Sequence, residues 1–203
     1  TIQQIVGRVT TFVVNLALAR LLVPEDFGTL AVLGIFLAIS TQLADIGFGS
    51  SLTRSERVDD ADLSTIFYYN IGMSSLLYLI LFIAAPWIAD YFRNPILVSV
   101  LRVISLSVVI NSLCSIQAIL VWRQMEFRKD MLIQLATGVL SGLTGIVMAY
   151  FGYGYWALVG MGLANSIVRL IGYWFSSSWR PKLIFSMEKL KLHFGYGSRM
   201  VGA

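Results

Sequence analysis

Short polar links divide the chain into long apolar runs. A transmembrane helix needs about 20 mostly apolar residues, at about 1.5 Å each. An apolar run such as 76–83 shows none of the alternation between polar and apolar positions that marks the strands of a transmembrane β-barrel. The pattern therefore predicts an all-α membrane protein with six transmembrane helices, at about residues 2–23, 27–48, 63–92, 96–122, 131–151 and 155–178.

The pattern changes after Arg180. Between residues 183 and 194, apolar and basic side chains recur at helical spacing, and Ser186 is suited to cap a helix. We expect a short amphipathic helix on the cytoplasmic face, with its lysines toward anionic headgroups, followed by the start of a seventh span. The chain would then consist of a six-helix lobe, 1–179, and a linker with the start of the next helix, 180–203. The side chains concerned are Met187, Leu190 and Phe194, with Lys189, Lys191 and His193 among them.

Composition supports a bilayer as the solvent. Hydrophobic residues make up 57% of the 203 residues, charged residues 13%, and the mean hydropathy is +0.77, whereas a soluble domain has roughly 25% charged residues. These values exclude a soluble globule, a disordered chain and a coiled coil. Cys114 is the single cysteine and His193 the single histidine, which excludes an intrachain disulfide and a multi-histidine metal site.

The distribution of basic residues predicts the orientation, because cytoplasmic loops carry an excess of Lys and Arg. The loops of one side hold nine such residues, whereas the other side holds Arg93, with Arg20 at a helix end. We therefore expect the nine-residue side, and with it the N-terminus, to be cytoplasmic. The nine are Arg54, Arg57, Arg123, Arg128, Lys129, Arg180, Lys182, Lys189 and Lys191.

Residues for catalysis are scarce. The acidic group Asp59, Asp60 and Asp62 follows a polar link and is interpreted as a solvated loop or a helix cap. Nucleophilic or general acid–base chemistry would need further His, Cys or paired acidic groups, and the Gly-x-x-x-x-Gly-Lys motif of nucleotide-driven pumps does not occur. We expect no enzyme, no cofactor, no metal site and no nucleic-acid partner.

Polar residues within the spans are the informative ones, because ionisable groups at membrane depth are costly and usually face a cavity or a partner. The charged ones are Arg8, Asp45, Arg102 and Arg169. Three arginines against one aspartate favour an anionic ligand, and arginine offers a planar fork to phosphate oxygens. Interhelical ion pairs and snorkelling at helix ends are the alternative. The uncharged companions are Asn15, Gln42, Asn70, Asn111, Gln117, Gln134 and Asn165.

Spacing gives these residues more specific roles. Arg8 and Asp45 lie at equal distances from the first turn, so they are expected to form an ion pair or a coupling site. Arg102 and Arg169 are expected to line a cavity at different depths, together with Arg8, Asn111 and Asn165. Asn165 and Tyr173 lie four residues on either side of Arg169 and share its helix face. In the fifth span, the small residues Gly138, Gly142 and Gly145 predict close helix contact.

Four segments resemble one transporter family. Residues 19–28, ARLLVPEDFG, resemble its "ARLLGPEDFG" signature, with Val23 in place of the usual glycine, and 44–49 resemble its "ADxGL" segment. Residues 117–127 resemble "QALLxRRMxF", and 152–158 resemble "GxGYWALV". The resemblance covers nearly the whole chain in order, and it is to the Wzx-like O-antigen and exopolysaccharide flippases of the multidrug/oligosaccharidyl-lipid/polysaccharide exporter superfamily.

This resemblance implies two helical lobes around a central cavity, and we expect this chain to be the N-terminal lobe. It implies alternating access that moves an undecaprenyl-pyrophosphate-linked oligosaccharide across the bacterial inner membrane. Membrane lipids, a polysaccharide polymerase and a chain-length regulator are the candidate partners. A cation-coupled multidrug exporter shares the superfamily fold and remains an alternative, although a cationic drug would favour carboxylates in the cavity. A membrane-embedded polymerase or acyltransferase would instead show a large extracytoplasmic loop or a catalytic His/Asp motif, whereas the outer links here are only a few residues each. An assembly role stays open.

Overall fold

The computed structural model describes residues 14, 16–22, 24–45, 52 and 58–190. Residues 16–21 are helical, and the described part of the chain holds helices and no strand. The expected all-α fold is thereby confirmed. The longer helices are α2 (Pro24–Asp45), α4 (Asp60–Tyr91), α5 (Ile96–Ile104), α6 (Leu106–Arg123), α7 (Phe127–Tyr150) and α8 (Tyr155–Ser176).

Four helical stretches are long and apolar enough to cross a membrane: α4, α5 with α6, α7 and α8. They correspond to the third to sixth predicted spans. The second predicted span corresponds to α2, which has 22 residues, while most of the first span and the start of a seventh near Phe194 lie outside the described residues. The count of six therefore stays a prediction.

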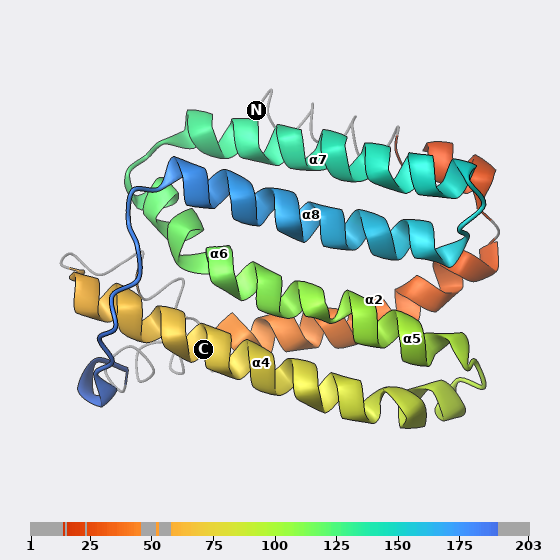
Figure 1. Ribbon diagram of the computed structural model, residues 1–203, viewed down its shortest axis with the longest axis horizontal. Helices are drawn as coiled ribbons and strands as arrows, with labels where there is room; N and C mark the ends of the chain where they lie inside the picture. Colours follow the sequence, from red (N-terminus) through yellow and green to blue (C-terminus); the bar gives the residue numbers. More distant parts are fainter. Residues whose placement is uncertain (1–13, 15, 23, 46–51, 53–57, 191–203) are drawn as a thin grey trace, which may run out of the picture.

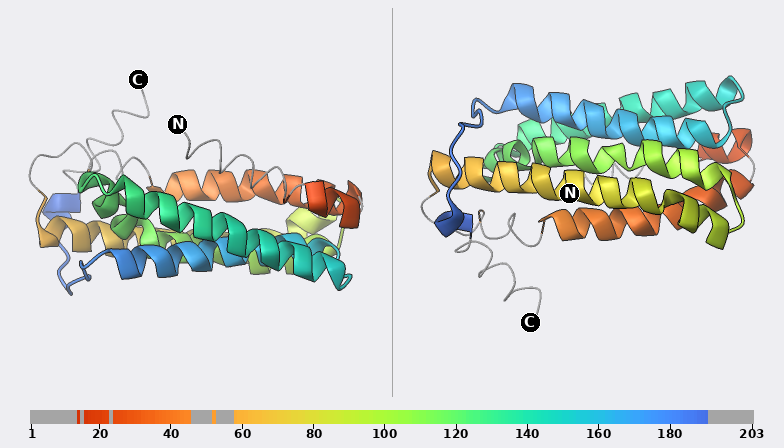
Figure 2. Two further views of the ribbon diagram at one scale, coloured as in Figure 1. Left: turned by 90° about the horizontal axis from the view of Figure 1, so that it is seen from above. Right: turned by 60° about the horizontal axis from the view of Figure 1, so that its bottom comes forward.

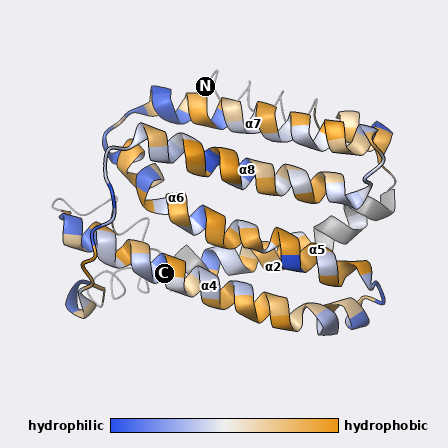
Figure 3. Ribbon diagram, in the orientation of Figure 1, coloured by the Kyte–Doolittle hydropathy of each residue, from blue (hydrophilic) through white to orange (hydrophobic). Residues whose placement is uncertain are grey.

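The helices form a flat bundle with nearly parallel axes. In Figure 1, α4, α6, α8 and α7 lie side by side in this order, and α2 crosses behind α4 and α6. Figure 2 shows α2 on one side of this layer. Apolar residues extend along the whole length of the helices, with hydrophilic residues concentrated at their ends (Figure 3). This distribution is typical of helices that contact lipid on their outer faces.

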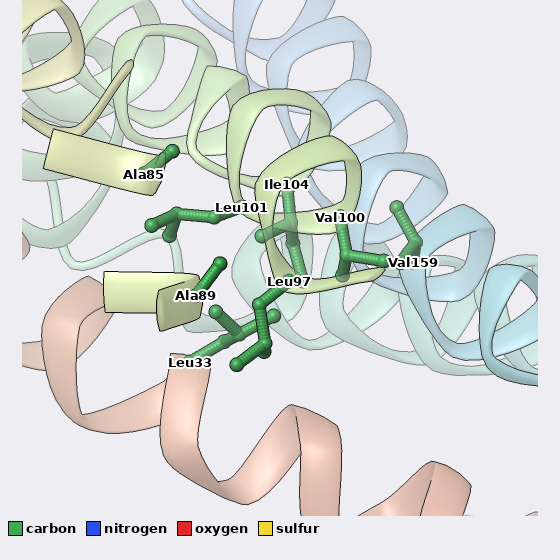
Figure 4. Packing of buried hydrophobic residues seen from close by; sticks show 8 residues of the cluster. All are labelled: Leu33, Ala85, Ala89, Leu97, Val100, Leu101, Ile104 and Val159. Carbon is green, nitrogen blue, oxygen red and sulfur yellow. The ribbon is translucent and has the colours of Figure 1, made fainter. Parts of the chain in front are cut away.

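Two apolar clusters hold the ends of the bundle together. Near the α4–α5 connection, α5 packs between α2, α4 and α8, with Leu33, Leu97, Leu101 and Val159 among the buried residues (Figure 4). At the opposite end, Ile66 and Phe67 of α4 pack with Ile116 of α6. Because α4 and α8 contribute to both clusters, α8 through Val159 and Trp174, their register is fixed along the layer.

The start of α4 corrects a predicted boundary. The third span was expected from Leu63, but α4 begins at Asp60, because Asp59 caps it. The backbone N–H of Asp59 donates to Asp62 Oδ2 at 3.0 Å, and the Asp59 side chain accepts from the backbone of Asp62. This capping box satisfies two N–H groups that the helix leaves unpaired. The cap interpretation of the acidic group is thus confirmed.

The predicted fourth span, 96–122, is interrupted at Ser105, where α5 ends and α6 begins. Ser105 keeps a helical backbone, with φ −65° and ψ −17°, and its hydroxyl donates to the carbonyl of Arg102 at 3.3 Å. Such bonds from serine to the preceding turn compete with the helix ladder and bend it. The span therefore consists of two helical segments.

Of the two connections on either side of α7, the first is shorter than predicted and the second agrees with the prediction. The link was expected to extend from Arg123 to Asp130, but α7 begins at Phe127 and Asp130 lies in its first turns. The tight turn after α7 is confirmed. Gly152 and Gly154 have φ values of +79° and +54° there, in the left-handed region that favours glycine.

Small residues bring α7 and α8 close together, as the fifth span predicted. A Cβ atom built on Gly145 would lie 3.1 Å from Cβ of Met161 on α8. From the other side, a Cβ on Gly172 of α8 would lie 2.8 Å from Cγ2 of Ile133 on α7. The two backbones therefore approach more closely than alanine would allow at these positions.

We expect Gly172→Ala to destabilise the protein by about 1–3 kcal/mol, because the stiff, β-branched side chain of Ile133 cannot turn away from the new methyl group. Thermal unfolding in detergent measures the change. Gly72→Ala on α4 is the control, since nothing lies within 4 Å of its built Cβ. That variant should be neutral or stabilised by up to about 1 kcal/mol from helix propensity. Equal stability of the two variants would contradict the close α7–α8 contact.

The segment 177–190, here called the strap, crosses from the end of α8 to the start of α4 (Figure 1). Its backbone donates from Lys182 to Ser64 Oγ and from Ser186 to Thr65 Oγ1, both at 3.1 Å. Trp179 packs against the ring of Phe67, with centroids 6.0 Å apart. The strap is thereby fixed along the first turns of α4.

The lysines of the strap form ion pairs with the start of α4. Lys182 Nζ lies 2.5 Å from Asp60 Oδ2, and Lys189 Nζ lies 2.7 Å from Asp59 Oδ1 and 3.1 Å from Asp62 Oδ1. Both lysines thus pair with the acidic start of α4; of the two, Lys189 belongs to the segment expected to face lipid headgroups. The described helical part of the expected amphipathic helix is residues 187–190, where Leu190 N–H donates to the Ser186 carbonyl. Lys191, His193 and Phe194 lie outside the described residues.

Two pKa values define the pH range of this attachment. The hydrogen bond with Asp62, and then that with Lys189, lowers the pKa of Asp59 from 3.8 to about 2. The hydrogen bond with Asp59 raises the pKa of Lys189 above 10.5. The contribution of Asp59 is therefore complete above pH 3.8 and lost as the pH falls through about 2. That of Lys189 is complete below pH 10.5 and lost as the pH rises above it.

Reversing one charge should loosen the strap without unfolding the bundle. We expect Lys182→Asp or Asp60→Lys to speed protease cleavage within the strap, because each variant places like charges together. Exposed ion pairs contribute only about 0–1 kcal/mol each, so global stability should change little. The double swap should restore much of the protection, and Lys129→Ala, outside the strap, should leave cleavage unchanged. Equal cleavage of the single and double variants would contradict the ion pair.

Candidate functional site

The polar face predicted for the sixth span belongs to α8, and this helix lies between α6 and α7 (Figure 1). Tyr173 has only 2% of its surface exposed, while Asn165 and Arg169 are half-buried. The guanidinium carbon of Arg169 lies 6.0 Å from the centroid of the Tyr173 ring. The Tyr173 end of the predicted stripe is therefore buried in the protein interior, and Arg169 lies one helical turn before Tyr173.

Tyr173 ends in a hydrogen-bonded cluster around a buried carboxylate. Its hydroxyl donates to Asp130 Oδ1 at 2.6 Å, and the indole N–H of Trp122 donates to the same oxygen at 3.3 Å. The amide of Gln134 donates to Asp130 Oδ2 at 3.1 Å. Asp130 has 3% of its surface exposed. A buried carboxylate is stable only with such donors, so this cluster joins α6, α7 and α8.

Sequence reasoning missed Asp130, because it follows a run of polar residues and was therefore assigned to a cytoplasmic link. A signal was present in the spacing. Asp130 and Gln134 are four residues apart, and Thr137 follows three residues later, so the three share a helix face with the apolar Ile133. Polar residues that share one helix face with an apolar residue indicate hydrogen bonding inside the protein, and they do not indicate a solvated loop.

The arginines of the spans lack carboxylate partners in the described part of the chain. The ion pairs there are Lys129 with Glu126 and the strap lysines with the acidic start of α4. Neither Arg102 nor Arg169 belongs to one. Within the described residues, the positive charge of Arg169 thus has no carboxylate partner.

The other predicted cavity residues have separate contacts. Arg102 packs against α4, with its guanidinium carbon 4.3 Å from the centroid of the Phe82 ring and Nε 3.4 Å from the Phe82 carbonyl oxygen. Asn111 of α6 donates to Ser166 Oγ of α8 at 3.2 Å. The structure thus brings Asn111 to α8, whereas Arg102 contacts α4. Their roles in substrate binding stay predictions.

The proposed pair of Arg8 and Asp45 cannot be placed in the same way. Arg8 lies outside the described residues, and Asp45 is described only as the last residue of α2. The pairing therefore stays a prediction.

The interior also holds polar side chains without a partner among the described residues. Gln117 of α6 is fully buried, and both its amide oxygen and its nitrogen lack a hydrogen bond. Ser74 of α4 and Thr137 of α7 are buried with unpaired hydroxyls. Each such group costs about 1–3 kcal/mol when it stays unpaired. The interior of the bundle therefore offers more hydrogen-bonding capacity than its own contacts use.

These features suit noncovalent binding of a polar, anionic group. A guanidinium without a carboxylate partner can donate two parallel hydrogen bonds to phosphate oxygens, and amide or hydroxyl groups can bind sugar hydroxyls. Within the described ranges, no group of three His, Cys, Asp or Glu side chains is placed to hold a metal ion. The site therefore favours the binding and release of such a polar, anionic group.

Comparison with known proteins gives a consistent family match. The family described as polysaccharide biosynthesis protein matches residues 17–203. The chain is 26% identical over 192 residues to the succinoglycan biosynthesis transport protein ExoT of Rhizobium meliloti (strain 1021), covering 95% of this chain and 39% of that protein. It is 28% identical over 185 residues to the lipopolysaccharide biosynthesis protein WzxC of Escherichia coli (strain K12), covering 89% and 37%.

A third relative comes from Bacillus subtilis. The chain is 24% identical over 157 residues to the teichuronic acid biosynthesis protein TuaB of Bacillus subtilis (strain 168), covering 76% of this chain and 32% of that protein. The chain thus spans less than two fifths of the length of each of these three relatives. No solved structure matches the chain.

Proposed function

We propose a transport function from one premise: the chain belongs to the polysaccharide biosynthesis protein family. The protein moves an undecaprenyl-pyrophosphate-linked oligosaccharide from the cytoplasmic to the periplasmic leaflet of the bacterial inner membrane. It does so by alternating access, with this helix bundle as one of two lobes. The four membrane-length helical stretches support a multi-pass membrane protein. The names of the relatives favour a polysaccharide intermediate over a cationic drug.

The observation that carries this proposal is the half-buried Arg169, which lacks a carboxylate partner among the described residues. An isolated cation within an apolar helix is costly, and a pyrophosphate offsets that cost by accepting charge-assisted hydrogen bonds. Tyr173 and Asp130 hold the adjoining part of α8 against α7, so the arginine is carried by a fixed helix face. Arg102, near the outer end of the bundle, would meet the pyrophosphate closer to its release.

Deletion of the full-length gene tests this function in cells. We expect lipid-linked repeat units to accumulate on the cytoplasmic leaflet and surface polysaccharide to be lost, both restored by the gene on a plasmid. Surface polysaccharide at the parental level in the deletion strain would reject the proposal.

The orientation gives a separate prediction. Single cysteines at Asn94 and at Ser55, in a Cys114→Ser background, should label oppositely with a membrane-impermeant thiol reagent in intact cells. Asn94 lies in the α4–α5 connection, which we place in the periplasm, so its cysteine should label. The Ser55 cysteine should label only after the membrane is permeabilised. Labelling at Ser55 alone in intact cells would reverse the orientation.

A further inference from the structure

A cavity lies between α6 and α8, close to the strap. It has a volume of about 360 Å³, and its accessible wall is apolar throughout, including the part that Arg180 contributes. Two of the wall residues are exposed at the surface of the bundle, Ile171 by 50% and Phe175 by 87%. The cavity therefore opens on the outer surface of the described bundle. Its apolar walls are Leu113 of α6 and Leu170, Ile171, Trp174 and Phe175 of α8.

The side chain of Arg180 is fixed beside this cavity. Its Nη1 donates to the carbonyls of Ser177 and Trp179 at 2.7 and 2.8 Å, and its Nη2 donates to the carbonyl of Trp174 at 3.0 Å. The guanidinium carbon lies 5.1 Å from the centroid of a Trp174 ring. The contacts with Trp174 and Ser177 satisfy carbonyls that the end of α8 leaves unpaired, and all three contacts hold the guanidinium in one position.

Two of the five guanidinium N–H groups remain available. The three hydrogen bonds to carbonyls leave Nε–H and one N–H of Nη2 without an acceptor among the described residues. No carboxylate in the described part of the chain forms an ion pair with Arg180. The neighbouring Lys182 is bound to Asp60 and adds no free cation. The apolar cavity thus lies beside one fixed positive charge with two free donors, since the guanidinium packs on the wall residue Trp174.

We propose that this cavity binds an anionic phospholipid from the leaflet on the strap side. One acyl chain lies against the apolar walls, and the phosphodiester accepts hydrogen bonds from Nε–H and Nη2–H of Arg180. A phosphodiester carries a single negative charge, which one guanidinium balances, whereas a pyrophosphate carries more charge than the cavity offers. The lipid links α6 to the end of α8 and stabilises the helix end from which the strap begins.

Native mass spectrometry of the full-length protein tests this site, with added dioleoyl phosphatidylglycerol or dioleoyl phosphatidylcholine. We expect phosphatidylglycerol to bind at least about tenfold more tightly, because it has a net negative charge, whereas the choline cation of phosphatidylcholine neutralises its phosphodiester. Arg180→Gln should reduce this preference to about onefold. Ile171→Trp should fill the cavity and remove the preferential binding. Ile167→Trp is the matched control, since Ile167 lies on α8, is 43% exposed and does not line the cavity.

Three results would overturn the proposal. The first is equal affinity for the two lipids in the wild-type protein. The second is the same loss of preference in Ile167→Trp as in Ile171→Trp. The third is displacement of bound phosphatidylglycerol by equimolar undecaprenyl phosphate, which would assign the cavity to a polyprenyl lipid. If Arg180→Gln does not fold, the two tryptophan variants decide alone. Because none of these measurements follows transport, the lipid site can fail while the transport proposal stands.

Discussion

Arg169→Ala is expected to abolish export of surface polysaccharide while the protein is still present at its normal level in the membrane. The loss of about two charge-assisted hydrogen bonds, roughly 3 kcal/mol, corresponds to about a hundredfold weaker binding of the pyrophosphate. Arg169→Lys keeps the charge but loses the planar fork, so it should retain partial export. Surface polysaccharide, measured against the amount of protein in the membrane, checks both variants.

Arg93→Ala provides the control for this prediction. Arg93 is exposed in the α4–α5 connection, so the loss of its charge should leave export unchanged. Wild-type export from the Arg169→Ala protein would reject Arg169 as a substrate-binding residue. A fall in export that only follows a lower protein level would instead assign Arg169 a structural role.

Asp130→Ala should destabilise the bundle more than any other single change considered in this protein. It removes the acceptor for Tyr173, Trp122 and Gln134 at once, and three donors left unpaired cost about 3–5 kcal/mol in total. Asp130→Asn keeps one carbonyl oxygen as an acceptor and should cost less. Unfolding in detergent, followed by near-ultraviolet circular dichroism, measures both.

A double-mutant cycle isolates the bond between Asp130 and Tyr173. If the hydroxyl and the carboxylate interact, the loss in Asp130→Ala combined with Tyr173→Phe should be smaller than the sum of the two single losses. Tyr153→Phe serves as the control, because Tyr153 lies exposed in the turn after α7. Additive losses for Asp130 and Tyr173 would show that the two side chains do not stabilise each other.

The long helices could be predicted because apolar length and polar links are local features of the sequence. Two of the corrected boundaries, the starts of α4 and α7, involve charged residues that the fold uses. Asp60 and Asp62 belong to α4 because Asp59 caps the helix and the strap lysines pair with the acidic group. Asp130 can lie buried in α7 because the hydroxyl of Tyr173, 43 residues later, donates a hydrogen bond to its carboxylate.

The candidate site was predicted in part for a related reason. The shared face of Asn165, Arg169 and Tyr173 follows from helical spacing alone, and the structure places it on α8. What spacing could not give is the partner of each side chain on another helix. The contact of Arg102 with Phe82 depends on how α5 packs against α4, and the contact of Asn111 with Ser166 depends on how α6 packs against α8.

The most direct test of the proposed transport is translocation by the purified full-length protein in liposomes. Undecaprenyl-pyrophosphate-linked oligosaccharide is distributed over both leaflets, and an external glycosidase digests the glycan that it reaches. Without translocation about half of the glycan is protected. We expect the wild-type protein to make nearly all of it accessible, and the Arg169→Ala protein to leave about half protected. Protection of half the glycan with the wild-type protein, under the ion gradients tested, would contradict the proposed function.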